Sequence, residues 1–299
     1  MAEKKSVSLV LGSGGARGYA HIGVIEVLQE QGFEIKAISG SSMGALIGAL
    51  YACGKLEVYK EWILTLDMLD VAKLLDLSWG NAGIIQGEKV FQVIEEMIGE
   101  VAIEELPVSY SAVATDITNQ KEVWFQKGRL VDAVRASIAI PTIFTPVKIG
   151  TRYLVDGGVV NPIPIAPTIS DMTDLTVAVN LDANVLKRYK ADIPEPEQKK
   201  QQGIQSKFYD LWEQAQELLT PEQSEKSHAL NMFDVMGKTI DTMQNTLAQY
   251  KMAGYTPDVI IEIPKDACGF YEFNKAYEMI ELGRLIAKET LDSFKDQVS

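Results

Sequence analysis

Apolar segments of strand length and amphipathic segments of helical length alternate at the start of this chain. Residues 7–11 and 33–38 have the strand pattern, whereas residues 19–31 and 43–53 place apolar side chains at helical spacing. This order implies parallel strands joined by crossover helices, in a sheet that is covered on both faces. We therefore expect an α/β fold with a parallel, buried sheet.

The same two patterns return along the rest of the chain. Helical spacing recurs in residues 56–77, 88–98 and 274–294. Strand patterns recur in residues 110–114, 122–125, 147–149, 152–155, 175–181 and 259–263. The third and fourth of these strands are separated by Gly150 and Thr151, so we expect them to form a hairpin.

Composition changes after the strand at residues 175–181. Residues 187–202 carry two prolines and many charged or amide side chains, which is typical of a solvated excursion. Two helical patterns follow, at residues 208–219 and 230–250, and the second is rich in methionine. This helical pair either packs against the main domain or forms a lid that admits acyl chains or touches lipid.

The core pattern resumes at residue 259, so the helical pair interrupts a domain and does not end it. We expect one domain over residues 1–299, with a core at about residues 6–182 and 256–294. The helical, cap-like insertion is expected at about residues 185–255.

Charge limits the partners that this chain can have. It contains 41 Asp and Glu residues against 28 Lys and Arg residues, a net charge of -13. This balance argues against nucleic-acid binding, which depends on basic side chains, and against electrostatic attachment to anionic lipid. Peripheral membrane contact would have to use apolar surface, for which the helical insertion is the candidate.

The segment around the first strand bears on the compartment. Lys4 and Lys5 precede the apolar residues 7–11, as in a signal peptide, but that run is too short and lacks a convincing cleavage site. No apolar stretch approaches the ~18 residues of a membrane-spanning helix. We therefore expect a cytoplasmic protein.

The main chemical signal is the pentapeptide Gly40-Ser41-Ser42-Met43-Gly44, a G-x-S-x-G sequence. It follows an expected strand and precedes an expected helix, which is the context of a nucleophile elbow. In such a turn, glycines two residues either side of the serine avoid clashes, and the helix N-terminus favours negative charge nearby. The alternative is a simple strand-to-helix turn.

A nucleophilic serine needs a base, and histidine is scarce in this chain. His21 follows the glycine-rich loop, where a hydrogen-bonding core role is favoured, and His228 falls in the insertion. If neither histidine serves, the base must be a carboxylate, and Asp156 is the best candidate because the two glycines after it permit a turn that could bring it inward. An ordinary Asp-Gly turn is the alternative. Asp is a weak base in water, so this assignment demands a dry site.

The loop after the first strand offers donors for an oxyanion. Gly14, Gly15, Ala16, Arg17 and Gly18 form a run in which several backbone N–H groups can turn toward one point. A dinucleotide-binding loop would need a third glycine where Arg17 stands, which disfavours that reading.

Together these motifs resemble the patatin-like phospholipases, in particular a bacterial branch similar to the catalytic domain of neuropathy target esterase. The resemblance covers roughly residues 6–182. It rests on the glycine-rich loop, the serine pentapeptide, Asp156-Gly157-Gly158 and the run Ala136-Ser137-Ile138-Ala139-Ile140-Pro141. Ser13 departs from the pattern, because many relatives have a third glycine there.

The resemblance implies a three-layer patatin-like fold and a serine acyl hydrolase that acts on phospholipids, lysophospholipids or other lipid esters without a metal or cofactor. By position, Ser42 would be the nucleophile, Asp156 the base and residues 14–18 the oxyanion loop. Two other functions stay open: a regulatory or interaction protein that retains the fold, and an acyl transferase that uses the same residues.

Overall fold

The computed structural model describes residues 5–74, 88–141, 144–185 and 232–298. The chain divides into two compact units, and the larger one comprises Met1–Pro194 and Ile240–Ser299. The polar excursion at residues 187–202, the first helical pattern of the insertion at residues 208–219, and His228 lie outside the described residues.

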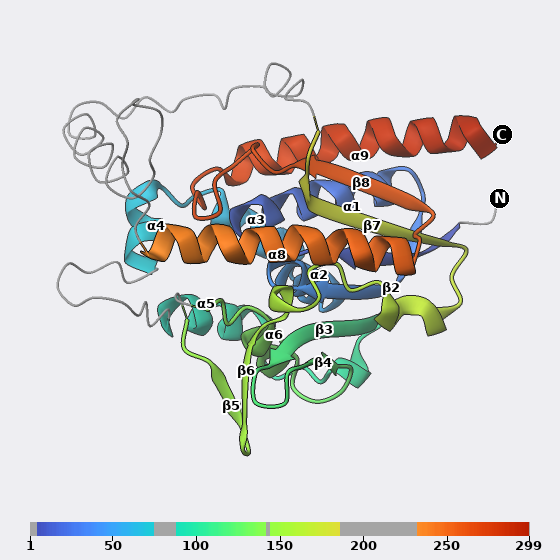
Figure 1. Cartoon of the computed structure of the whole chain (residues 1–299). Helices are drawn as coiled ribbons and strands as arrows, with labels where there is room; N and C mark the ends of the chain where they lie inside the picture. The colour runs from blue at the N-terminus through green and yellow to red at the C-terminus, as the bar shows by residue number, and fades with distance from the viewer. Residues whose placement is uncertain (1–4, 75–87, 142–143, 186–231, 299) are drawn as a thin grey trace, which may run out of the picture. The chain divides into compact units, whose positions relative to one another are not determined.

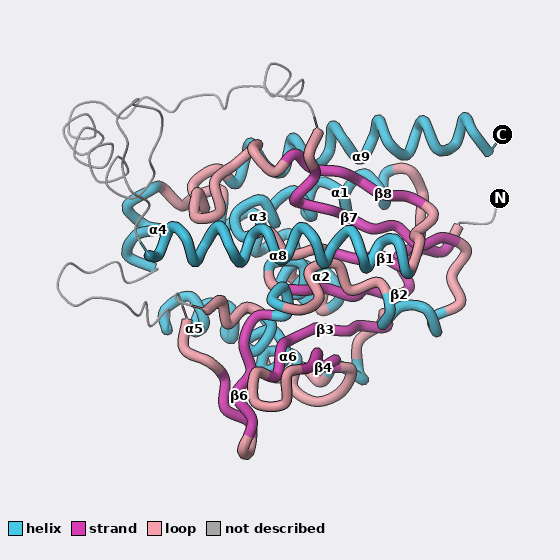
Figure 2. The backbone as a smooth tube through the Cα atoms, viewed as in Figure 1, coloured by secondary structure: helices cyan, strands magenta, loops and turns pink. Residues whose placement is uncertain are grey.

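Eight strands of the described residues form one sheet in the order β5-β6-β3-β2-β1-β7-β8, with β4 paired to β3 (Figure 2). The central strands run parallel and are β1 (Ser6–Leu11), β2 (Glu34–Ser41), β3 (Ser109–Asp116), β7 (Leu175–Ala183) and β8 (Val259–Pro264). The antiparallel strands are β4 (Lys121–Phe125), β5 (Val147–Ile149) and β6 (Arg152–Asp156). The parallel sheet and the hairpin expected from the sequence are thus confirmed.

The helices of the described residues follow the expected pattern with two exceptions. They are α1 (Ala20–Glu30), α2 (Met43–Ala52), α3 (Leu56–Ile63), α4 (Met68–Leu74), α5 (Glu88–Ile98), α6 (Leu130–Ser137), α8 (Met232–Gly254) and α9 (Ala276–Val298). One exception is α6, which the sequence analysis did not predict. The other is the helical spacing expected over residues 56–77, which the structure divides into two helices, because α3 ends before Thr65 and Asp67; residues 75–77 lie outside the described residues. The Thr65 hydroxyl bonds the Trp62 carbonyl, and the Asp67 carboxylate accepts from the N–H of Asp70 in α4.

Alternating side chains of the strands face two different helical layers. Leu9 and Val179 belong to the cluster formed with α1, α2 and α9. On the opposite face, Val10 and Ala178 pack with Ala248 of α8, which crosses the sheet (Figure 1). The arrangement is the three-layer one expected from the motifs, and part of the expected insertion, α8, supplies one of its layers.

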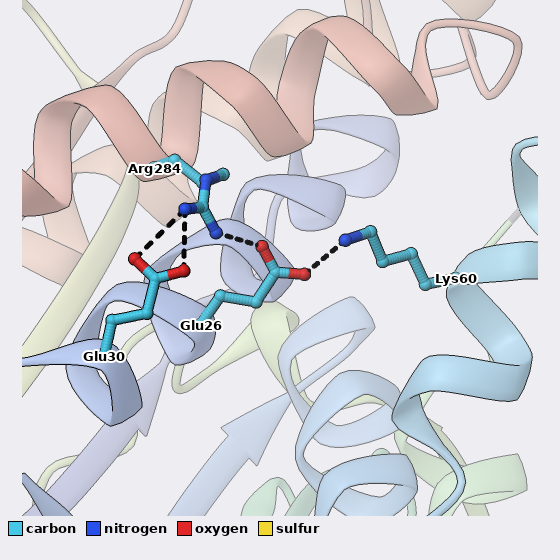
Figure 3. Close-up of polar contacts among 4 residues, drawn as sticks. All are labelled: Glu26, Glu30, Lys60 and Arg284. Atoms are coloured by element: carbon cyan, nitrogen blue, oxygen red, sulfur yellow. Dashed lines mark hydrogen bonds and ion pairs between the residues drawn. The ribbon is translucent and has the colours of Figure 1, made fainter. Parts of the chain in front are cut away.

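Helices α1 and α9 touch through two glycines. A Cβ on Gly23 would lie 2.1 Å from the Ile280 carbonyl oxygen, and a Cβ on Gly283 would lie 2.1 Å from that of Ala20. Beside this contact, Arg284 of α9 bonds Glu26 and Glu30 of α1 (Figure 3). Lys60 of α3 bonds the same Glu26, so one partly buried ion network joins three helices on this layer.

A helix that crosses a membrane must be both long and apolar. Among the helices of the described residues, none has both properties to the degree that a membrane span requires.

The glycine contact predicts a stability defect. Gly283→Ala should lower the free energy of unfolding by about 2–3 kcal/mol, because its methyl group meets backbone that cannot move aside. Gly254→Ala is the matched control, since a Cβ there meets nothing within 4 Å; it should change stability by less than about 1 kcal/mol. Urea unfolding measures both variants, and a Gly283→Ala midpoint equal to that of the wild type would show that the helices are not tightly packed here.

Candidate active site

The strand, turn and helix expected around Ser42 are present. Strand β2 ends at Ser41, and α2 begins at Met43. Neither glycine of the pentapeptide has room for a side chain. A Cβ on Gly40 would lie 2.4 Å from the Gly44 carbonyl carbon, and a Cβ on Gly44 would lie 2.1 Å from the Leu11 carbonyl oxygen. The tight turn therefore brings α2 directly against β1 and β2.

Ser42 has a backbone conformation that few non-glycine residues adopt, with φ 56° and ψ -127°. Such a conformation costs about 1–3 kcal/mol and persists only where neighbouring groups enforce it. The Ser42 carbonyl accepts hydrogen bonds from the N–H groups of Ala45 (2.9 Å) and Leu46 (3.2 Å). Its own N–H donates to the hydroxyl of Ser137 at 3.0 Å. The backbone is thus held from both sides.

Asp156 is the last residue of β6 and is buried. Its backbone N–H donates to the Ala139 carbonyl at 2.9 Å, and its carbonyl accepts from the Thr115 hydroxyl at 2.9 Å. One carboxylate oxygen, Oδ1, accepts from the Gly158 N–H at 2.7 Å. The other, Oδ2, is buried without a hydrogen-bond partner among the described residues. A buried oxygen without a partner costs free energy, so its presence calls for an explanation such as a catalytic role.

Burial raises the pKa of Asp156 to about 7, while the Ser42 hydroxyl and the Gly158 N–H oppose that shift. The Ser42 hydroxyl therefore lies close enough to act on the carboxylate. The neighbouring residues of the two segments also approach closely, because a Cβ on Gly157 would lie 2.7 Å from the Ser41 Oγ. The structure brings Ser42 and Asp156 together, although 113 residues separate them.

The glycine-rich loop lies beside the same turn. It leaves β1, and residues 15–19 form a short 3₁₀ helix in which Gly15 has a φ of 56°. A Cβ on Gly18 would lie 2.4 Å from the Cβ of Met43, the residue that follows Ser42. On its other side the loop is covered, because a Cβ on Gly14 would meet Leu181 at 2.7 Å.

The backbone N–H groups of the loop differ in their availability. Ala16 donates to the Phe270 carbonyl at 2.9 Å, and Arg17 donates to the Gly14 carbonyl at 3.2 Å. For the N–H groups of Gly14, Gly15 and Met43, no acceptor is found within the part of the chain that the structure describes. These three N–H groups therefore have no acceptor among the described residues, as the donors of an anion-binding loop would.

The side chain of Arg17 is engaged by other parts of the chain. Its guanidinium forms an ion pair with Asp182 (2.6 Å) at the end of β7 and donates to the Lys265 carbonyl (2.6 Å) after β8. Burial raises the pKa of Asp182 and of Asp241 in α8, and Arg17 opposes both shifts. Arg17 therefore links the loop to the ends of β7 and β8, and its charge acts on Asp241 of α8.

His21 has the core role that its position suggested. It is fully buried, its Nε2 lies 2.8 Å from the Gly12 carbonyl oxygen, and burial lowers its pKa to about 4. The neutral ring thus donates to Gly12, just before the glycine-rich loop.

Sequence reasoning did not assign a role to the residues that hold these groups in place. Ser137 was noted only within a motif, and its bond to Ser42 crosses 95 residues. Leu181 and Phe270, which line the loop, carry no local pattern that distinguishes them from other apolar residues.

Comparison with known proteins places these motifs in a family. A model described as patatin-like phospholipase matches residues 9–169. An uncharacterized NTE family protein of Mycobacterium tuberculosis is 38% identical over 331 aligned residues, which cover 97% of this chain and 92% of the relative. A putative patatin-like phospholipase domain-containing protein of Caenorhabditis elegans is 27% identical over 97% of this chain, but the match covers 26% of its own length.

Among solved structures, VipD from Legionella pneumophila aligns with a TM-score of 0.47 at 16% identity, covering 98% of this chain and 67% of VipD. The family match does not depend on this alignment, since the family model spans more than half of the chain and the mycobacterial relative aligns along nearly all of it. The chain therefore belongs to the patatin-like phospholipase family, whose members are lipid acyl hydrolases.

Proposed function

We propose that this protein is a serine acyl hydrolase of lipid esters in which Ser42 is the nucleophile and Asp156 the general base. The observation that supports it most is the buried carboxylate of Asp156, whose pKa of about 7 is raised by burial and opposed by the Ser42 hydroxyl. Its Oδ2 has no hydrogen-bond partner among the described residues and is therefore available to accept a proton. A raised pKa at a buried group beside a nucleophile is what general-base catalysis requires.

The reaction follows the acyl-enzyme route. Asp156 takes the proton of the Ser42 hydroxyl while Oγ bonds to the acyl carbonyl carbon. The resulting oxyanion accepts hydrogen bonds from the free N–H groups of Gly14, Gly15 and Met43. Asp156 then returns the proton to the leaving alkoxide. Water, deprotonated by Asp156, attacks the acyl-enzyme, releases the fatty acid and restores Ser42.

Burial is what makes Asp156 strong enough for this role. In water an Asp carboxylate has a pKa of ~3.9, whereas burial in the fold raises the pKa of Asp156 to about 7, so the buried carboxylate is the stronger base. At a pH somewhat above 7 it is ionised and still basic, which is the condition for efficient proton transfer. A bound acyl chain that excludes water would strengthen this effect further.

Arg17 has a supporting role in this proposal. Its side chain is occupied by Asp182 and the Lys265 carbonyl, and its N–H by Gly14. We assign it to fixing the shape of the loop, and Gly18 to the close packing of that loop against Met43. The donors to the oxyanion are then the first two glycines of the run together with Met43, since the N–H of Ala16 is engaged by Phe270.

Replacing the base should stabilise the fold at alkaline pH. The folded protein binds the Asp156 proton more tightly than the unfolded chain does, so stability falls as pH rises from ~4 to about 7 and stays low above it. Asp156→Asn removes that charge and should raise the unfolding free energy at pH 8 by roughly 1–3 kcal/mol, after the loss of hydrogen bonding is subtracted. At pH 5 the gain should be smaller.

Asp116→Asn is the matched control with the opposite sign. The Asn119 side chain and the N–H groups of Thr118 and Asn119 bond the Asp116 carboxylate and lower its pKa, so its loss should reduce the melting temperature at pH 8. If Asp156→Asn were also less stable than the wild type at pH 8, the ionised Asp156 carboxylate would not destabilise the fold.

Removal of either partner should abolish turnover. We expect Ser42→Ala and Asp156→Asn each to lower hydrolysis of p-nitrophenyl butyrate and of lysophosphatidylcholine by on the order of 1,000-fold or more, because the two groups act as a unit. Asp174→Asn is the control, because Asp174 directly precedes β7 and bonds Ser6 at the start of β1; this variant should stay near the wild-type rate. Released fatty acid is measured without an added alcohol, so that hydrolysis is distinguished from acyl transfer. Wild-type turnover in either variant would refute the assigned pair.

A further inference from the structure

A short segment at the end of α6 contacts both members of the proposed pair. The hydroxyl of Ser137 accepts the backbone N–H of Ser42 at 3.0 Å. Two residues later, the carbonyl of Ala139 accepts the backbone N–H of Asp156 at 2.9 Å. Both Ser137 and Ala139 are fully buried. Residues 137–139 therefore bond the backbone of Ser42 and that of Asp156 from one place.

The Ser137 hydroxyl also fixes this segment to the sheet. It donates to the carbonyl of Val113 in β3 at 2.6 Å while it accepts from Ser42. The same carbonyl oxygen is approached by Gly157, where a Cβ would lie 2.1 Å from it. The Val113 carbonyl thus contacts both Ser137, which holds the Ser42 backbone, and the turn that follows Asp156.

The unusual backbone of Ser42 explains why a hydroxyl is needed. Ser42 has a φ of 56° at the turn between β2 and α2, and its N–H donates to the Ser137 hydroxyl. In this buried site the N–H would be unpaired without Ser137. A buried N–H without a partner costs about 1–3 kcal/mol. A hydroxyl accepts from Ser42 and donates to Val113 at once, which an alanine side chain cannot do.

We propose that Ser137 is a positioning residue for the Ser42–Asp156 pair, and that residues 137–139 set how the Ser42 hydroxyl meets the Asp156 carboxylate. This inference rests on the proposed function. Ser137 does not touch the substrate in this account. Its loss should misplace the nucleophile, and misplacement of a reacting group by ~1 Å costs about 100-fold in rate.

The chain offers a matched control. Ser39 in β2 is also fully buried, and its hydroxyl has no hydrogen-bond partner among the described residues. Ser39→Ala and Ser137→Ala remove the same atom from similar surroundings, but only the second removes hydrogen bonds to the site. Ser137→Cys is a further variant of nearly native size, whose thiol is a poor acceptor, and it carries the test if Ser137→Ala does not fold.

The experiment measures kcat and KM for p-nitrophenyl butyrate, together with melting temperature, for the full-length wild type and these variants. Ser137→Ala and Ser137→Cys should lower kcat by about 10- to 100-fold with KM changed less than about twofold, because orientation and not binding is lost. Ser39→Ala should leave kcat within about twofold of the wild type.

The outcomes separate the two proposals. An active wild type with Ser137 variants that match Ser39→Ala in kcat would overturn the positioning role and leave the proposed function intact. The positioning role would also fail if the Ser137 variants raised KM and left kcat unchanged. A wild type that hydrolyses no ester would overturn the proposed function and this inference with it.

Discussion

The backbone of Ser42 is the point on which the rest of the site depends. Its positive φ turns the chain sharply from β2 into α2, and the turn is tight enough that Gly40 and Gly44 can carry no side chain. The strain of about 1–3 kcal/mol is balanced by the first turn of α2 on one side and by Ser137 on the other. A parallel sheet packed against helices provides the rigidity that this balance requires.

Electrostatics adds a second cost at the same place. The carboxylate of Asp156 is buried with one oxygen unpartnered, which raises its pKa to about 7. Other contacts in the same unit add stability away from the site, such as the glycine packing of α1 on α9 and the ion network around Glu26. Under the proposed function, strain at Ser42 and desolvation at Asp156 serve one purpose, since they align and activate a serine without histidine.

Much of this arrangement was predictable because the signals are local. The strand and helix patterns, the glycines around Ser42 and the turn after Asp156 are each contained in a few consecutive residues. The break between α3 and α4 was missed because the side chains of Thr65 and Asp67 compete with the helical backbone, which apolar periodicity does not register. Contacts such as Ser137 with Ser42, or Ala16 with Phe270, join distant segments and follow only from the tertiary structure.

The central claim, that buried Asp156 activates Ser42, is tested most directly by covalent labelling. The purified protein is treated with a fluorophosphonate between pH 5 and pH 9, the rate is followed, and the modified peptide is identified by mass spectrometry. The account predicts an adduct on Ser42, at a rate that rises with a single ionisation near pH 7. An adduct on another residue, or a labelling rate at Ser42 that does not change across this range, would contradict it.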